Sequence, residues 1–272
     1  MRKILTSFVI GTALSASGLA FAADMPLKAR APVAPPPTWT GFYIGINGGG
    51  AWGKTETSLS AVNGPIGFYN PANIPGVNQA GSISFNDSSG IFGGQIGYLQ
   101  QTGQVVLGIE AAFDWQKLKG SASVTQPYFA NPQLLSISES VSSNWLLTFL
   151  GRVGLDMGSW YPYLTGGLAV SDLTYNFTYA DPVFAPGCVG CAASLSQTRW
   201  GPAVGGGVEW KWDSHWSLRG EYLFVQFQDV TGGSSLTQPF AVPGETAGAS
   251  ALFTHNAKVK ESIARGFLSY RF

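Results

Sequence analysis

The sequence predicts an all-β chain that folds as an eight-stranded antiparallel transmembrane β-barrel, an up-and-down meander. Three observations support this prediction. Apolar and polar residues alternate with period two along eight segments of the chain. The connections between these segments are alternately short and long, and the tryptophans gather at the segment ends. Together these features are typical of a barrel whose apolar side faces lipid rather than a core.

The first segment at 39–53 and the last at 261–272 are expected to close the barrel. The last one carries Ala264, Gly266, Leu268, Tyr270 and Phe272 on one face, and Glu261, Arg265, Ser269 and Arg271 on the other. A lipid-facing apolar side and a charged lumen side explain this arrangement. The two strands must pair, because an open edge would leave backbone groups unsatisfied in hydrocarbon.

The remaining strands are expected in chain order between these two. They are placed at 90–101, 105–116, 143–157, 161–175, 198–212 and 216–229. Tight turns are expected at 102–104, 158–160 and 213–215, and long loops at 54–89, 117–142, 176–197 and 230–260. Short periplasmic turns and long outer loops are the topology of outer-membrane barrels. A ten-stranded barrel stays open, since the first and last long loops could each hide part of a hairpin.

The N-terminal residues 1–22 are predicted to be a secretory signal peptide. Arg2 and Lys3 precede an apolar stretch, and an A-x-A signal places cleavage between Ala22 and Ala23. Residues 23–38 form a Pro-rich periplasmic tether, and residues 39–272 form the outer-membrane β-barrel. Loss of Arg2 and Lys3 leaves 13 basic against 15 acidic side chains, a net charge of −2. This balance argues against nucleic acid as a partner.

Eight tryptophans are predicted to form two aromatic girdles. The outer girdle comprises Trp52, Trp115, Trp145 and Trp200, and the periplasmic girdle comprises Trp160, Trp210, Trp212 and Trp216. Each has the parity of its strand's apolar face, which Trp39 lacks. Amphipathic rings at two levels are typical of a membrane barrel, whereas a sandwich would bury its tryptophans centrally.

The opposite parity predicts a charge network in the lumen. Its members are Glu110, Asp114, Arg152, Asp156, Glu209, Lys211, Arg219, Glu221, Glu261, Arg265 and Arg271. An eight-stranded barrel is only just wide enough for its own side chains, so these charges are expected to pair. The main interpretation is a polar plug that holds the barrel closed. A narrow path for ions or small solutes remains the alternative.

Several motifs that could carry chemistry have plainer interpretations. Residues 48–55 fit the P-loop pattern, but no helical period follows them. Cys188 and Cys191 form C-x-x-C in a long loop, and a disulfide is expected in an oxidising envelope. His215 and His255 have no partner at a meaningful spacing and are expected to be solvated loop residues. The sequence therefore predicts no catalytic, cofactor or metal site and no enzyme.

The long loops pair aromatic residues with proline, as at Phe68–Tyr69, Tyr128–Phe129, Phe184 and Phe240. Such rings could gather into a patch that binds an extracellular ligand. They could equally pack the loops onto one another.

Both ends of the mature sequence resemble a known family. The matching motifs are Ala23-Asp24-Met25-Pro26 after the signal, TGFYIG at 40–45 and FLSYRF at 267–272. They resemble the small Gram-negative outer-membrane β-barrel surface proteins, the OmpA/OmpX and opacity-protein group, especially α-proteobacterial members. The resemblance implies the cell outer membrane, with lipid and lipopolysaccharide as partners, and insertion by the barrel-assembly machinery through Phe272. The motifs do not specify function, because the family is functionally mixed. The chain as a whole predicts a structural and surface-interaction role, with a small low-conductance porin as the alternative.

Overall fold

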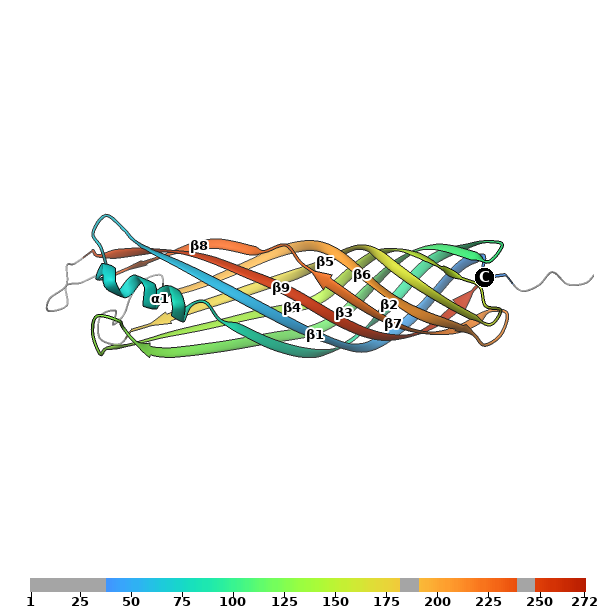
Figure 1. Cartoon of the computed structure of the whole chain (residues 1–272), viewed down its shortest axis with the longest axis horizontal. Helices are drawn as coiled ribbons and strands as arrows, with labels where there is room; N and C mark the ends of the chain where they lie inside the picture. The colour runs from blue at the N-terminus through green and yellow to red at the C-terminus, as the bar shows by residue number, and fades with distance from the viewer. Residues whose placement is uncertain (1–37, 182–190, 239–247) are drawn as a thin grey trace, which may run out of the picture. The chain divides into compact units, whose positions relative to one another are not determined.

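The computed structural model describes residues 38–181, 191–238 and 248–272, which form one antiparallel sheet closed into a ring (Figure 1). Strand β1 pairs with both β2 and β9, so the first and last strands close the barrel as expected. The strands are β1 (Gly41–Asn63), β2 (Ser84–Thr102), β3 (Val105–Pro127), β4 (Leu134–Leu155), β5 (Trp160–Ala180), β6 (Ala192–Lys211), β7 (Trp216–Gln226), β8 (Val230–Thr237) and β9 (Ser250–Arg271). The predicted antiparallel barrel is confirmed.

The nine strands of the described residues give eight positions around the ring, because β7 and β8 share one of them. Strand β7 pairs with residues 260–270 of β9, and β8 pairs with residues 250–257 of the same strand. The two therefore follow one another along a single edge of β9. The eight-stranded prediction is confirmed, and the ten-stranded alternative is not found among the described residues.

Strands β1 to β6 and β9 are longer than predicted, whereas β7 ends at Gln226 rather than at residue 229, so the expectation of long loops is wrong over much of their length. Strand β1 runs over 23 residues, and β3 and β4 run over 23 and 22. Most of the predicted loop at 117–142 is therefore a β-hairpin. Residues 48–55, which fit the P-loop pattern, lie inside β1, so no helix N-terminus follows them to hold a phosphate.

The extra length forms a part of the barrel that we call the outer extension, beyond the outer tryptophan level. It comprises β8 and residues 53–63, 84–87, 116–127, 134–144, 172–180, 192–199 and 250–261. Along β3 the outward residues change from Trp115 to Lys117 and Lys119, and the inward ones from Asp114 to Leu118. The polarity of the wall therefore reverses. An apolar outward wall suits lipid and a polar one suits water, so the extension needs a hydrophobic interior of its own.

Strand β4 reverses its faces through a bulge at the outer tryptophan level. The register with β5 shifts between Ser142 and Leu146. The Asp172 carboxylate accepts hydrogen bonds from the backbone N–H groups of Asn144 and Trp145, at 2.9 and 3.2 Å. The bulge therefore turns Trp145 outward while Ser143 and Leu146 both stay buried.

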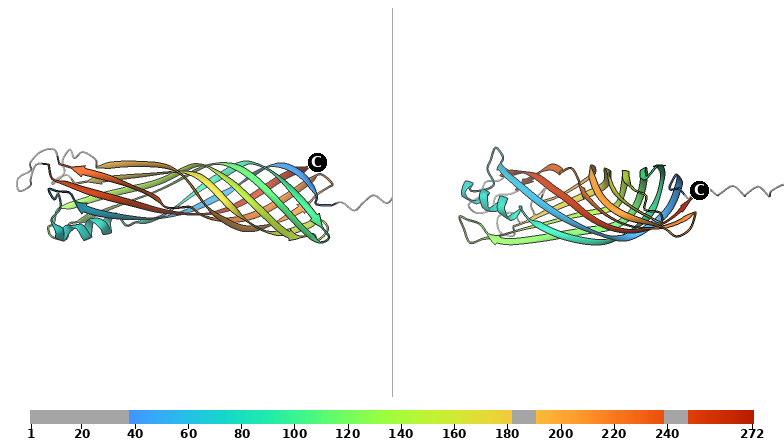
Figure 2. Two further views of the ribbon diagram at one scale, coloured as in Figure 1. Left: turned by 90° about the horizontal axis from the view of Figure 1, so that it is seen from above. Right: turned by 45° about the vertical axis from the view of Figure 1, so that its right-hand side comes forward.

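A short helix fills the place that β2 leaves in the outer extension. Helix α1 (Ile74–Ala80) follows the 3₁₀ turn η1 (Pro71–Asn73), and both lie at the barrel end opposite the C-terminus (Figures 1 and 2). Val77 and Ala80 of α1 are buried, and Asn78 accepts a hydrogen bond from the Ala61 N–H at 2.7 Å. Among the described residues, no helix is long and apolar enough to cross a membrane.

Candidate functional site in the barrel lumen

Eight charged side chains meet inside the membrane-spanning part of the barrel. They are Glu110 and Asp114 from β3, Arg152 from β4, Glu209 from β6, Arg219 and Glu221 from β7, and Arg265 and Arg271 from β9. None is more than 5% exposed. Alternation along each strand turns them inward, since successive side chains of a strand point to opposite faces.

Glu110 lies at the centre of the first group of ion pairs. Its Oε2 and Oε1 atoms accept hydrogen bonds from Nη1 and Nη2 of Arg219, at 2.6 and 3.0 Å. Arg152 approaches the same carboxylate at 3.6 Å and pairs with Glu209 at 2.8 Å. The Tyr43 hydroxyl donates to Glu110 at 2.6 Å. Each charge in this group is therefore shared or hydrogen-bonded, as buried charges require.

Arg265 joins the second group of ion pairs. Its guanidinium contacts Asp114 at 2.6 Å and Glu221 at 2.8 Å. The Tyr163 hydroxyl donates to Glu221 at 2.7 Å, and its ring lies 3.9 Å from Cζ of Arg152. Tyr163 thus links the two groups into one network.

Arg271 and Ser217 complete the environment of Glu209 near the end of the barrel where β9 ends and β7 begins. Arg271 Nη2 lies 3.2 Å from Glu209 Oε1, and the Ser217 hydroxyl donates to the same oxygen at 2.7 Å. Each carboxylate oxygen of Glu209 therefore accepts a hydrogen bond from an arginine, Oε1 from Arg271 and Oε2 from Arg152.

Glycines on the lumen face make room for the aromatic members of the network. A Cβ atom at Gly97 would lie 2.3 Å from the Tyr43 hydroxyl oxygen, and one at Gly207 would lie 2.6 Å from that of Tyr163. The new Cβ would also lie 2.6 Å from the Ile109 carbonyl oxygen at Gly97 and 2.3 Å from the Gly220 carbonyl oxygen at Gly207, so any larger residue would displace both a tyrosine that holds a carboxylate and the neighbouring strand. The sequence is therefore rich in glycine where the lumen is most crowded.

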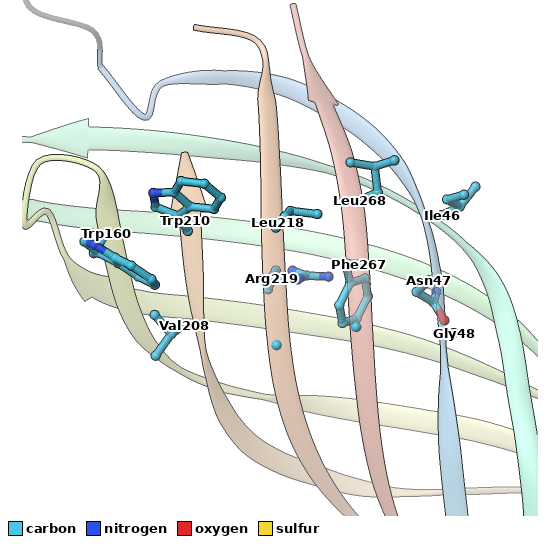
Figure 3. A pocket seen from close by; sticks show the side chains of 12 residues that line it. Ile46, Asn47, Gly48, Trp160, Val208, Trp210, Leu218, Arg219, Phe267 and Leu268 are labelled. Carbon is cyan, nitrogen blue, oxygen red and sulfur yellow. The ribbon is translucent and has the colours of Figure 1, made fainter. Parts of the chain in front are cut away.

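The ring of Phe267, on β9, packs against two arginines of the network. Cζ of Arg219 lies 3.5 Å from the Phe267 ring centroid, and Cζ of Arg265 lies 5.1 Å from it. Arg219 and Phe267 are register partners, and they lie side by side on β7 and β9 in Figure 3. Such cation–π contacts stabilise a guanidinium that has lost its water.

Trp39 closes the lumen at the end of the barrel where β1 begins and β9 ends. It is fully buried, and its indole N–H donates to Asp156 at 2.9 Å. Lys211 Nζ lies 4.3 Å from its ring, and Arg271 Cζ lies 4.8 Å from it. Trp39, which lacks the girdle parity, therefore blocks the lumen at this end. We call Trp39 together with Asp156 and Lys211 the Trp39 stopper.

Three residues predicted for the lumen network occupy other environments. Asp156 is half-buried and accepts hydrogen bonds from Trp39 and, at 2.7 Å, from Gln101. Lys211 donates to the Thr38 carbonyl at 3.3 Å. Glu261 is buried at the outer tryptophan level, beside Gly53 of β1. The first two belong to the Trp39 stopper rather than to the central ion pairs.

The eight girdle tryptophans lie on the outward face of the barrel wall. Six are exposed, namely Trp52, Trp115, Trp160, Trp200, Trp212 and Trp216. Trp145 and Trp210 are partly covered and stack on neighbours, with Trp145 6.2 Å from Phe113 and Trp210 6.0 Å from Trp160. Phe272 is 76% exposed at the end of β9, and its N–H donates to the Phe42 carbonyl at 3.0 Å.

A buried polar cluster in the outer extension includes His255, whose predicted exposure is wrong. His255 is fully buried, with Nε2 2.8 Å from the Ser234 hydroxyl and Nδ1 3.4 Å from that of Tyr175. Tyr175 in turn donates to Glu139 at 2.9 Å. Burial lowers the pKa of His255 to about 4 and raises that of Glu139. His215 is exposed in its turn, as expected.

Aromatic residues of the outer end pack against each other. Phe68, Tyr69 and Tyr128 are buried, and the ring of Tyr69 lies 6.3 Å from those of Tyr128 and Tyr179. Phe129 is 59% exposed. The described aromatics therefore mainly fill the extension, whereas Phe184 and Phe240 lie outside the described residues.

Sequence reasoning missed Tyr43, Tyr163 and Phe267 as members of the lumen site. All three have the inward parity of their strands, but only Phe267 shares its face with inward charges, namely Arg265 and Arg271, whereas the described strands β1 and β5 carry no inward charge. Of the other predicted sites, Ala22, Ala23 and Cys188 lie outside the described residues. Cys191 lies just before β6, and its Cys188 disulfide stays a prediction.

Comparison with known proteins is consistent with this architecture. A family model described as an outer membrane protein beta-barrel domain matches residues 13–242. The 31 kDa outer-membrane immunogenic protein of Brucella melitensis is 30% identical over 212 residues, which cover 76% of this chain and 80% of that protein. The 22 kDa outer membrane protein of Rhizobium leguminosarum bv. viciae is 27% identical over 211 residues, covering 75% and 74%.

Among solved structures, the outer membrane protein OprG of Pseudomonas aeruginosa aligns with 86% of this chain and 97% of its own, at 15% identity and a TM-score of 0.38. The attachment invasion locus protein Ail of Yersinia pestis aligns with 83% and 98%, at 10% identity and a TM-score of 0.30.

Proposed function

Because this chain belongs to the outer membrane protein beta-barrel domain family, we propose that it is a non-enzymatic structural barrel of the outer membrane. Its lumen is closed by paired charges, and its outer extension is the surface that meets the exterior. The observation that carries this proposal is the two-point ion pair between Glu110 and Arg219.

The ion pairs support a closed lumen because an ion could pass only by disrupting them. Glu110, Arg152 and Arg219 lie within one layer and are each at most 4% exposed. Removing one partner of a buried pair leaves an uncompensated charge and lowers the stability of the fold by about 3–5 kcal/mol. The stopper around Trp39 adds a second barrier at the periplasmic end.

Conductance of the refolded mature chain in a planar bilayer tests the proposal. We expect a silent bilayer, with folding verified independently by a heat-dependent shift on a gel. Arg219→Ala should admit current by opening the central layer, whereas Lys119→Ala, which changes an outward residue, should stay silent. Discrete, reproducible channel steps from the unaltered protein would overturn the closed-lumen proposal.

A small low-conductance pore is the second candidate, and two buried atoms favour it. Thr148 Oγ1 and Gln95 Oε1 face the lumen and have no hydrogen-bond partner within the described part of the chain. Buried polar atoms of this kind suit water. If the lumen does conduct, Arg152→Ala should change the selectivity between cations and anions, because it removes a fixed positive charge from the path.

The proposal excludes catalysis at the cluster of Ser234 and His255, although these residue types serve as nucleophile and base in hydrolases. His255 is fully buried, and its ring lies 4.5 Å from that of Phe177 and 6.2 Å from that of Phe253. Packed rings occupy the space that a substrate would need. Hydrolysis of an ester by the refolded barrel that Ser234→Ala abolishes would contradict this.

The terminal segments have proposed roles in export and assembly. We propose cleavage between Ala22 and Ala23, a periplasmic tether at 23–38, and recognition of Phe272 by the barrel-assembly machinery. The intact mass of the purified protein gives the cleavage site. Alkylation with and without reductant reports whether Cys188 and Cys191 are joined. Deleting Phe272 should reduce insertion in cells but not refolding in vitro.

A further inference from the structure

Five lysines face outward just beyond the outer tryptophan level, on three strands of the barrel. They are Lys54 on β1, Lys117 and Lys119 on β3, and Lys258 and Lys260 on β9. Strands β9, β1, β2 and β3 are consecutive neighbours in the ring, so these lysines form one patch. We call it the lysine sector.

The lysine sector lies at the surface of the membrane. Lys54 follows the exposed Trp52 by two residues on the same face of β1, and Lys117 follows the exposed Trp115 in the same way on β3. Tryptophan side chains mark the level of the lipid headgroups. A step of two residues along a strand is about 7 Å, so the ammonium groups of these lysines reach the headgroups.

The sector is unfavourable for the barrel alone, which points to a ligand. Lys54 and Lys260 are direct register partners on β1 and β9, and like charges placed opposite each other destabilise a sheet. Two acids lie at the sector: Glu56 pairs with Lys54 at 2.8 Å and is the register partner of Lys258, and Asp229 accepts a hydrogen bond from Asn256 of β9 at 3.0 Å. The five lysines outnumber them. Lys54, together with Lys260 and Lys258, lowers the pKa of Glu56, which reflects the local positive potential.

The opposite side of the outer extension differs in chemistry. Strands β4, β5 and β6 present hydroxyl and amide groups there, namely Ser138, Ser140, Asn176, Thr178, Ser196 and Thr198. Their outward charge within the described range is Asp172, whose carboxylate holds the β4 bulge. The positive charge is therefore confined to one sector and is not a general property of the rim.

An apolar groove lies below the lysine sector, in the lipid-facing wall. It crosses β1, β2 and β3, with Ile44, Ile96 and Phe113 as walls. Gly94 leaves it open, since an added Cβ there would meet no atom closer than 3.5 Å. The groove and the lysines thus share the same strands. A molecule with anionic groups at the membrane surface and acyl chains below would contact both.

We propose that the lysine sector and this groove bind lipopolysaccharide, the anionic glycolipid of the outer leaflet. The lysines pair with the acidic groups of its sugar headgroup, and the groove holds an acyl chain. This inference rests on the assignment of the outer extension to the cell exterior. It does not depend on whether the lumen conducts, so its test is separate from the conductance measurement.

The test uses the refolded mature chain in phosphatidylcholine vesicles that contain lipopolysaccharide. After mild solubilisation, native mass spectrometry counts the glycolipid molecules that each barrel retains. Each lysine near an anionic surface contributes about fivefold in affinity, so Lys117→Ala with Lys119→Ala should weaken retention by roughly 25-fold. Lys258→Ala with Lys260→Ala should behave alike. High salt should reduce retention by the unaltered protein.

Matched variants separate the site from net charge and from misfolding. Thr178→Glu with Thr198→Glu changes the net charge by the same −2 on the opposite side and should retain lipopolysaccharide normally. Lys117→Arg with Lys119→Arg should also retain it. Gly94→Phe, which fills the groove without changing any charge, should weaken retention. All variants must first show the heat-dependent gel shift of a folded barrel.

Two results would overturn the proposal. Equal loss of lipopolysaccharide from the lysine variant and from the threonine control would show that net charge, not the sector, governs retention. Equal lysine-dependent retention of phosphatidylglycerol, in vesicles that contain it instead, would show that the site binds any anionic lipid.

Discussion

Arg219 on β7 reaches across the barrel to Glu110 on β3 and forms two hydrogen bonds with its carboxylate, at 2.6 and 3.0 Å. Four places separate these strands in a ring of eight, so the pair spans the full width of the lumen. A bidentate arginine–carboxylate pair fixes both distance and orientation. The contact therefore ties opposite walls of the barrel together.

Arg219→Ala should destabilise the barrel by about 3–5 kcal/mol, because Glu110 would keep a buried charge without its main partner. Urea unfolding in lipid vesicles, followed by tryptophan fluorescence, measures the free energy of unfolding. Adding Glu110→Ala should cost less than the sum of the two single changes, because the pair is removed together. A purely additive double variant would show that the two residues do not interact.

Trp39→Ala should lower the free energy of unfolding by about 3 kcal/mol, since it removes a fully buried ring and leaves Asp156 without the indole donor. Trp39→Phe keeps a ring but not the N–H, so an intermediate loss is expected. The same urea titration provides the measurement. If Trp39→Ala unfolds like the unaltered protein, Trp39 is not part of the folded lumen.

Gly97→Ala should destabilise the barrel by about 1–3 kcal/mol, because the new methyl group would lie 2.3 Å from the Tyr43 hydroxyl oxygen and 2.6 Å from the Ile109 carbonyl oxygen of the neighbouring strand. Gly94→Ala is the matched control on the same strand. Its added carbon meets no atom closer than 3.5 Å, so a gain of about 0.5 kcal/mol is expected from the stiffer backbone. Equal effects of the two substitutions on the urea midpoint would contradict the crowding around Tyr43.

Acid should weaken the outer extension through His255, whose pKa burial lowers from 6.5 to about 4. The unfolded chain binds a proton below pH 6.5 and the folded chain does not. Stability is therefore complete above pH 6.5 and falls as the pH drops toward 4, on the order of 1–2 kcal/mol at pH 5. The raised pKa of Glu139 acts in the opposite direction, since the folded state then takes up a proton more readily.

Comparison with His255→Gln isolates the histidine from Glu139 in that experiment. The substituted barrel should lose less stability than the original between pH 7 and pH 5, measured by urea unfolding at both values. An identical loss in the two proteins would mean that His255 already titrates normally in the folded state.

The membrane-spanning wall could be predicted from sequence because its pattern is local. Every second residue of a strand faces the same side, so Leu107, Ile109 and Trp115 identify the lipid face of β3 without any knowledge of its neighbours. The same rule assigned Glu110 and Arg219 to the lumen. Residue parity is enough for such assignments, since it requires no long-range contact.

The outer extension could not be predicted in the same way because its polarity is reversed. Leu135, Ile137 and Val141 alternate with serines on β4, so this stretch has the polar outward face of a loop rather than the apolar outward face of a lipid-facing strand. His255 was misplaced for this reason. Its burial becomes evident only when β8 pairs beside it and supplies Ser234.

Alternation along the chain determined by itself that this is a membrane barrel with charges turned inward, because each strand carries its own two-residue repeat. The tertiary structure decided which acid meets which base. Glu110 lies 109 residues from Arg219, and their contact depends on the register of every strand between them. A slip in any of those registers would change the partners in the lumen while leaving the local pattern intact.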